Sequence, residues 1–201
     1  MFALVESGSI IKMLRGNKGI TIDGIQHPRA IYTLWTEAER NALGIYTVEY
    51  DNSNKKDEKW YINTNQSYAF GSGKVTATYG TATAKAHADT LYTAQDETDG
   101  LGTEGELKSR GLKYKLIQDV KLEAANELTK TDWYVVRKSE ESTAIPSAIT
   151  THRRLVRTKA AAMETSITNA SDTPALETLY TYTTDSDGVH SRPLGEIPTL
   201  D

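Results

Sequence analysis

The fold class of this 201-residue chain is decided first by the stretch Ser67-Tyr68-Ala69-Phe70-Gly71-Ser72-Gly73-Lys74-Val75-Thr76-Ala77-Thr78-Tyr79. After the glycines, the apolar residues Val75, Ala77 and Tyr79 alternate with two threonines, and a period of two is typical of a half-buried strand. The run Gly71-Ser72-Gly73 predicts the tight turn that joins this strand to the preceding one. A β-hairpin is therefore predicted over these residues.

The remainder of residues 1–80 favours the same class of structure. Residues 2–6 and 10–14 flank Ser7-Gly8-Ser9 and predict a second hairpin, and further strands are expected at 20–22, 45–50 and 60–62. A short helix is predicted over 36–43, because Thr36 and Glu39 have the spacing of a capping box and Gly44 follows as a stop. We therefore predict a small antiparallel β-rich module.

The second half of the chain has a helical period. A capping-box spacing at Thr103 and Glu106 predicts a helix to about Leu128. Thr131-Asp132 predicts a short helix through Val136, and the alternative is a strand over 133–136. The apolar stripe of the first helix would consist of Leu107, Tyr114, Ile117, Val120, Ala124 and Leu128.

The last third of the chain is divided by prolines. Ile145-Pro146 interrupts the helical pattern, and Thr150 then predicts a helix to about Ile167 with Leu155, Met163 and Ile167 facing inward. Pro174 occupies a favoured first-turn position for a last short helix over 175–180. Residues 185–201 contain two further prolines and predict an extended tail.

Taken together, these patterns predict an α+β protein in four segments. Residues 1–80 form the β-rich module, and residues 81–105 form an acidic connector rich in Thr, Ala and Gly. Residues 106–170 form a helical hairpin or a three-helix module. Residues 171–201 form a short helix and an extended tail.

The apolar content is low. Leu, Ile, Val and Phe make up 39 of the 201 residues, a fraction at which chains are disordered only when their net charge is also high. The net charge is only -4, so we expect an ordered chain with a thin core. The deficit falls mainly in 80–105 and 180–201, which predicts segments that lie on partner surfaces.

Bulk features exclude several classes. The chain has no cysteine, which excludes disulfides, thiolate metal sites and cysteine nucleophiles. It has no run of roughly 18 apolar residues, so we expect no membrane span. Its first residues lack the basic and apolar regions of a secretory signal.

No motif for catalysis or cofactor binding is convincing. Residues 100–105 match G-x-G-x-x-G, but Glu104 and Glu106 would repel a phosphate, so an acidic turn is favoured. Residues 71–74 lack the spacing of a phosphate loop, and residues 185–188 lack the later ligands of a calcium loop. His27, His87, His152 and His190 are scattered. We therefore expect no enzyme activity, no catalytic residue, no cofactor and no metal site.

The candidate functional residues are partner contacts. Arg153, Arg154 and Arg157, together with His152 and Lys159, form a basic cluster on a predicted helix. Arg153 and Arg157 are four residues apart on one face. Pairing with the acidic stretches 89–106 or 161–201, in the same chain or a neighbouring one, is favoured over nucleic-acid binding. Trp133 and Tyr134 are expected to insert between two helices and complete this set of candidates.

The helical half resembles accessory tail proteins of tailed bacteriophages, of the tail-fibre and fibre-assembly type. The resemblance lies in residues 128–137, Leu-Thr-Lys-Thr-Asp-Trp-Tyr-Val-Val-Arg, and continues through Thr143-Ala144-Ile145-Pro146 and Thr150-Thr151-His152-Arg153 to Arg157. His152 stands where a tyrosine is common. Residues 1–14 and Leu34-Trp35-Thr36 are similar to the start of marine-phage proteins. The resemblance implies a virion tail component or an assembly factor without enzyme activity.

Our leading hypothesis is a structural virion protein of a tailed phage: a tail-fibre, adaptor or baseplate-proximal subunit. It would be synthesised in the bacterial cytoplasm, bind other tail proteins and form a homo-oligomer within a symmetric assembly. One alternative is a tail-fibre assembly chaperone that is absent from the virion. Another is a glycan-binding tail module, in which Trp60, Tyr61 and Tyr68 would stack on sugar rings.

Overall fold

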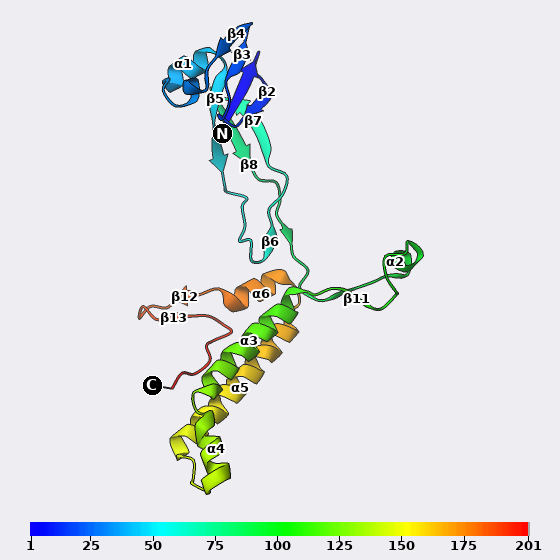
Figure 1. Cartoon of the computed structure of the whole chain (residues 1–201), viewed down its shortest axis with the longest axis vertical. Helices are drawn as coiled ribbons and strands as arrows, with labels where there is room; N and C mark the ends of the chain where they lie inside the picture. Colours follow the sequence, from blue (N-terminus) through cyan, green and yellow to red (C-terminus); the bar gives the residue numbers. More distant parts are fainter. Residues whose placement is uncertain (201) are drawn as a thin grey trace. The chain divides into compact units, whose positions relative to one another are not determined.

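A computed structural model of the chain describes residues 1–200, which divide into two compact units, Met1–Thr83 and a second unit that begins at Ala84. Strands dominate the first unit and helices the second (Figure 1). The prediction of an α+β protein with strands before helices is therefore confirmed.

The first unit is built on a five-stranded sheet with the order β2-β1-β5-β8-β7. Its strands are β1 (Phe2–Glu6), β2 (Ser9–Leu14), β5 (Ile45–Asp51), β7 (Ser67–Gly71) and β8 (Lys74–Thr78). The predicted antiparallel pairing holds for three of the four strand pairs of this sheet, and the exception is β5 with β8, which pair in parallel. The connection through residues 52–73 is long enough to return the chain to the same end of the sheet, as a parallel pair requires.

Both predicted hairpins are confirmed. The β1–β2 turn places Ser7 and Gly8 at positive φ, and the β7–β8 turn does the same with Ser72 and Gly73. Left-handed backbone at two successive residues matches the right-handed twist of the flanking strands. A third hairpin, β3 (Ile20–Ile22) with β4 (Ile25–His27), contains one strand that the sequence analysis missed. The short strands β6 (Tyr61–Ile62) and β9 (Thr83–Ala84) complete the set.

The predicted short helix is present as α1 (Glu37–Ala42), preceded by the 3-10 turn η1 (Arg29–Tyr32). Thr36 and Glu39 form the reciprocal capping box, in which each side chain accepts from the other residue's backbone N–H. Gly44 adopts a φ of 75°, and a Cβ there would lie 2.5 Å from the Val5 carbonyl oxygen. Only glycine therefore fits between this helix and β1.

The two faces of the sheet bury different residues. Alternation along β1 sends Leu4 to one face and its neighbours Ala3 and Val5 to the other. The predicted inward residues Val75 and Ala77 are fully buried. The first cluster consists of Leu4, Leu14, Ile20, Ile22, Ile31, Tyr32 and Ile45, and the second of Ala3, Val5, Val48, Val75 and Ala77.

The second unit contains the long helices α3 (Leu112–Thr129) and α5 (Ser147–Asn169), which lie side by side in opposite directions (Figure 1). Val120, Ala124, Met163 and Ile167 are buried, as predicted. Three inward assignments are wrong, since Leu107 is 40%, Tyr114 44% and Leu155 47% exposed. The buried faces are completed by Leu116 and Glu127 on α3 and by Ile149, His152, Arg153, Val156 and Ala160 on α5.

The shorter helices follow the sequence signals closely. Residues 132–141 form α4 (Asp132–Glu141), which confirms the helix rather than the alternative strand. Helix α5 begins directly after Pro146, three residues before the predicted start at Thr150. Helix α6 (Thr173–Tyr180) has Pro174 in its first turn, and the Asp172 side chain accepts from the Ala175 N–H. No helix within residues 1–200 has the length and apolar character needed to cross a bilayer.

Residues 89–111 form a projecting hairpin that we call the arm (Figure 1). It consists of β10 (Thr90–Leu91), α2 (Ala94–Thr98) and β11 (Leu107–Ser109). The predicted helix start at Thr103 is wrong, because Thr93 and Asp96 form the capping box instead. Gly100 and Gly105 then adopt a φ of 70° and 83°, which interrupts a helix and returns the chain to the unit.

The end of the chain is more ordered than an extended tail. Strands β12 (Thr183–Thr184) and β13 (His190–Ser191) pair as a small hairpin. Leu194 and Ile197 then return to the interior of the second unit, where they are 2% and 5% exposed. Leu194 and Ile197 of the predicted tail are therefore used within the chain itself, whereas Val189 and Leu200 are 56% and 39% exposed.

Candidate interaction surfaces

Helix α4 carries a stacked cluster of Trp133, Tyr134 and Arg137, which we call the α4 cluster. The two rings lie 3.8 Å apart between centroids, with an angle of 32° between their planes. The guanidinium carbon of Arg137 lies 4.6 Å from the Trp133 ring centroid and 5.4 Å from that of Tyr134. Its Nε is buried and, among the described residues, has no hydrogen-bond partner.

The α4 cluster lies on an exposed surface. Trp133 is 51% exposed, and the neighbouring Val135 and Val136 are 43% and 52% exposed. The prediction that Trp133 inserts between two helices is wrong. Thr131 occupies that interior position and is fully buried, and the start of the helix at Asp132 turns Trp133 outward.

Arg153 anchors α4 to the two long helices. Its Nη1 donates to the Leu128 carbonyl oxygen at 2.8 Å and to the Thr131 Oγ1 at 2.7 Å, and it pairs with the Asp132 carboxylate at 2.9 Å. The side chain is 10% exposed. The acid that pairs with Arg153 is thus Asp132 and not one from the predicted acidic stretches. Arg153 is therefore used within the chain, and the remaining candidates for partner contacts are Trp133, Tyr134, Arg154 and Arg157.

A second polar network, centred on Glu127, lies beside the bonds of Arg153, and the sequence did not predict it. The Glu127 carboxylate accepts from Lys130 Nζ at 2.5 Å and from the Leu200 N–H at 2.8 Å, and it lies 3.1 Å from His152 Nε2. The bond from Lys130, then that from Leu200, lowers the pKa of Glu127 below its usual value. A single acidic residue on a helical stripe gives no signal in the sequence that it will be buried.

Arg154 and Arg157 are exposed on the outward face of α5. Arg157 donates to the Arg153 carbonyl oxygen at 3.4 Å. In the described part of the chain, neither residue forms an ion pair with a carboxylate. Of the predicted basic cluster, these two side chains are therefore the ones that could form ion pairs with a partner.

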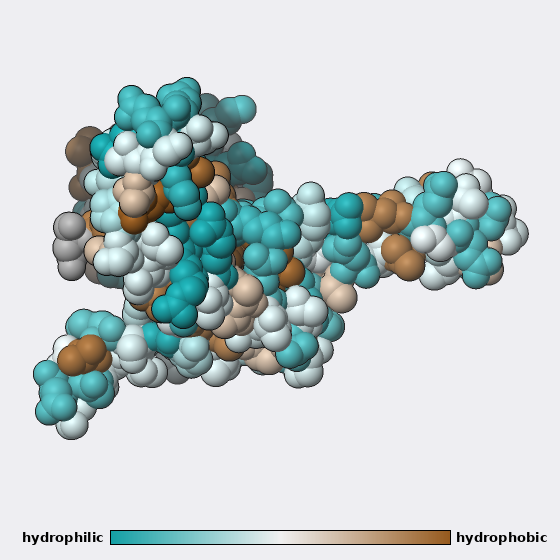
Figure 2. Space-filling model, turned by 90° about the horizontal axis from the view of Figure 1, so that it is seen from below, coloured by the Kyte–Doolittle hydropathy of each residue, from teal (hydrophilic) through white to brown (hydrophobic). Residues whose placement is uncertain are grey.

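The arm is the third exposed feature of the second unit. Residues 89–110 contain six carboxylates and two cations, Lys108 and Arg110, which pair with Asp96 and Asp89. Leu91, Leu101 and Leu107 are 50%, 59% and 40% exposed, and Figure 2 shows apolar side chains between polar ones along this projection. Within residues 1–200, the hydrogen bonds of 90–109 all stay within the arm. The arm therefore adds surface rather than core.

Side chains that could support other chemistry do not come together. Among the described residues, no group of three His, Asp or Glu side chains is placed to hold a metal ion. His152 lies against Glu127, His190 Nδ1 lies 2.9 Å from Thr184 Oγ1, and His27 meets Trp35 edge-on. Trp60 and Tyr61 are 3% and 5% exposed, so the predicted sugar-stacking face is not presented to solvent.

Comparisons with models of protein families, with curated proteins and with solved structures found no match to this chain.

Proposed function

We propose that the chain is a structural virion protein of a tailed bacteriophage, a tail-fibre, adaptor or baseplate-proximal subunit that acts through protein–protein contacts. The observation that carries the proposal is the exposed α4 cluster. Trp, Tyr and Arg are the residue types that most often dominate binding energy at protein interfaces. In this chain the three are adjacent, stacked and flanked by two exposed valines.

The base of α4 supports this use of its surface. Arg153 ties the start of the helix to Leu128 and Thr131, so the cluster stands on a fixed support. A preorganised surface loses less conformational entropy on binding than a mobile one. The partner would be another tail protein.

The proposal includes a homo-oligomer. The arm carries a net excess of four carboxylates, and Arg154 and Arg157 have no carboxylate partner within residues 1–200. Opposite charges guide the orientation of two partners as they meet. The arm of one copy would lie against the outward face of α5 in the next.

Mass spectrometry of purified phage particles tests the proposal. We expect the chain in mature particles in a fixed ratio to other tail proteins. Its absence from particles, combined with lost infectivity when its gene is deleted, would contradict a virion role and support the alternative of an assembly chaperone. Charge reversal by Arg154→Glu and Arg157→Glu is expected to lower the mass of the oligomer measured by sedimentation, and Lys115→Glu with Lys138→Glu is the matched control.

A further inference from the structure

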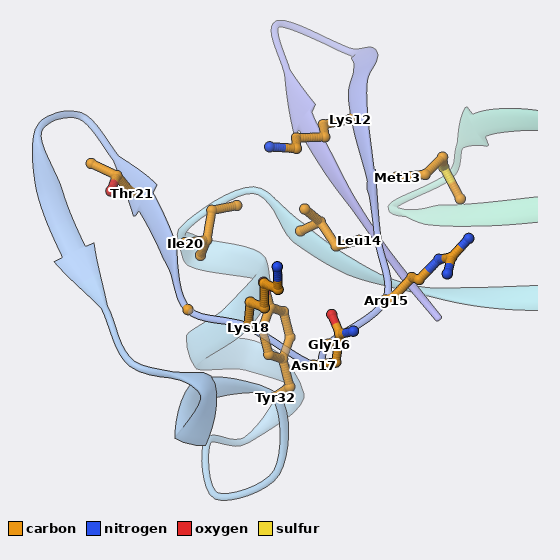
Figure 3. A pocket seen from close by; sticks show the side chains of 11 residues that line it. Lys12, Met13, Leu14, Arg15, Gly16, Asn17, Lys18, Ile20, Thr21 and Tyr32 are labelled. Atoms are coloured by element: carbon orange, nitrogen blue, oxygen red, sulfur yellow. The ribbon is translucent and has the colours of Figure 1, made fainter.

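The surface of the first unit has a hollow of about 630 Å3, which we call the basic hollow. It lies between the end of β2, the loop 15–19 and the start of β3 (Figure 3). Leu14, Ile20 and Tyr32 contribute to its lining and also belong to the buried core of this unit. Its volume is within the range of sites for small molecules.

The charges around the basic hollow are all positive. Lys12, Arg15 and Lys18 line it, and no Asp or Glu does. Residues 7–22 contain these three charges and no acid, although the whole chain has a net charge of -4. Within the described part of the chain, none of the three forms an ion pair. Figure 3 shows Lys12 and Lys18 on either side of Leu14 and Ile20, whereas the Arg15 side chain points away from them, on the side of Met13.

Lys12 is on β2, and the loop 15–19, which carries Arg15 and Lys18, is fixed by two glycines. Gly16 has a φ of 70°, and a Cβ there would lie 3.1 Å from the Phe2 ring and 3.5 Å from the Tyr32 ring. At Gly19, a Cβ would lie 2.5 Å from the His27 carbonyl oxygen. The backbone therefore runs directly against the core and β4, which defines the positions of the residues between the glycines.

We propose that the basic hollow binds a small ligand that carries two or more phosphate or carboxylate groups. Cations that line one concave surface repel one another, and an anion placed between Lys12 and Lys18 relieves this repulsion. Arginine and lysine form their strongest hydrogen bonds with phosphate and carboxylate oxygens. Asn17 and Thr21, which also line the hollow, supply neutral donors. This inference is independent of the proposed role in a tail.

Calorimetric titration of the full chain at fixed ionic strength tests the inference, with pyrophosphate and citrate as the probes and maltose as the neutral control. We expect one anion per chain and no heat from maltose. Binding of pyrophosphate alone identifies a phosphate site, binding of citrate alone a carboxylate site, and binding of both a general site for such anions. Each of these outcomes supports the inference.

The variant Lys12→Gln/Arg15→Gln/Lys18→Gln should weaken anion binding by about tenfold or more, because charge-assisted hydrogen bonds are lost. The matched control Lys115→Gln/Lys121→Gln/Lys138→Gln removes three exposed charges from the second unit and should bind as the wild type does. Lys18→Gln alone, in an exposed loop, gives a smaller loss and serves if the triple variant fails to fold. Absence of binding by both anions, or equal weakening in the two triple variants, would overturn the inference.

Discussion

The imidazole Nε2 of His152 and the carboxylate Oε1 of Glu127 lie 3.1 Å apart between the long helices, where the two residues are 8% and 5% exposed. An ionised carboxylate only accepts hydrogen bonds, so the imidazole nitrogen is the donor. The same carboxylate accepts from Lys130 and from the Leu200 N–H. One buried acid therefore joins α3, α5 and the C-terminal segment.

This network predicts how the free energy of unfolding depends on pH. Glu127 has its pKa lowered below 4.5, chiefly by the bond from Lys130. A carboxyl whose pKa is lower in the folded state stabilises the protein above its unfolded pKa, and this stabilisation is lost as the pH falls through the folded pKa. Urea unfolding at a series of pH values should show a loss below about pH 4.5 that Glu127→Gln reduces. The exposed control Glu140→Gln should keep the wild-type slope, and an equal slope in all three proteins would contradict this role of Glu127.

Neighbouring arginines should have very different effects on stability. Replacement of Arg153 by Met removes the charge-assisted hydrogen bonds that Arg153 donates to the Leu128 carbonyl and to the Thr131 hydroxyl, which costs about 2–3 kcal/mol of unfolding free energy. The exposed Arg154→Met should stay within about 0.5 kcal/mol of the wild type. Denaturant unfolding of the two variants measures the difference. Equal losses would mean that Arg153 does not anchor α4.

The α4 cluster should matter more for binding than for folding. Trp133→Ala removes a half-exposed ring and its stacking on Tyr134 and Arg137, so we expect a loss of about 1 kcal/mol. Leu116→Ala, in the buried face of α3, should cost about 2–5 kcal/mol. Thermal or urea unfolding gives both values. A loss at Trp133 as large as that at Leu116 would show that the ring is part of the core.

The packing of the loop beneath the basic hollow can be tested by replacing each of two glycines with alanine. Gly8 and Gly16 both have positive φ, so alanine at either position should cost about 1–2 kcal/mol through backbone strain. Gly16→Ala should cost more, because its Cβ would also press on the Phe2 ring at 3.1 Å, whereas nothing lies within 4 Å of the corresponding position at Gly8. Equal destabilisation in chemical unfolding would show that the loop does not pack on Phe2.

Features that depend on neighbouring residues could be predicted from the sequence. The capping box of Thr36 and Glu39 and the turn at Ser72-Gly73 are complete within four residues, so their signals are local. The parallel pairing of β5 with β8 has no such signal, because it depends on how a long connection returns. The helix start predicted at Thr103 and Glu106 is wrong for a similar reason, because the capping box forms at Thr93 and Asp96, a pair that the sequence did not single out.

The exposed surface of α4 was only partly predictable, because it too depends on contacts between residues that are distant in the sequence. The sequence indicated a helix around Trp133 and singled out Arg153, but it could not reveal which residue faces inward. That depends on Thr131 and Leu128, which meet Arg153 across a separation of more than twenty residues in sequence. The basic hollow likewise depends on the contact of Gly16 with Phe2 and Tyr32.

We propose that the chain enters the virion through the surface of α4. The most direct test is the number of copies per particle, measured by quantitative mass spectrometry when a deletion phage is complemented with variants. The account predicts wild-type copy numbers for the exposed control Leu122→Ala and the loss of the chain from particles for Trp133→Ala/Tyr134→Ala with the protein still folded. Incorporation of the double variant at the wild-type level, or particles that lack the wild-type chain, would contradict it.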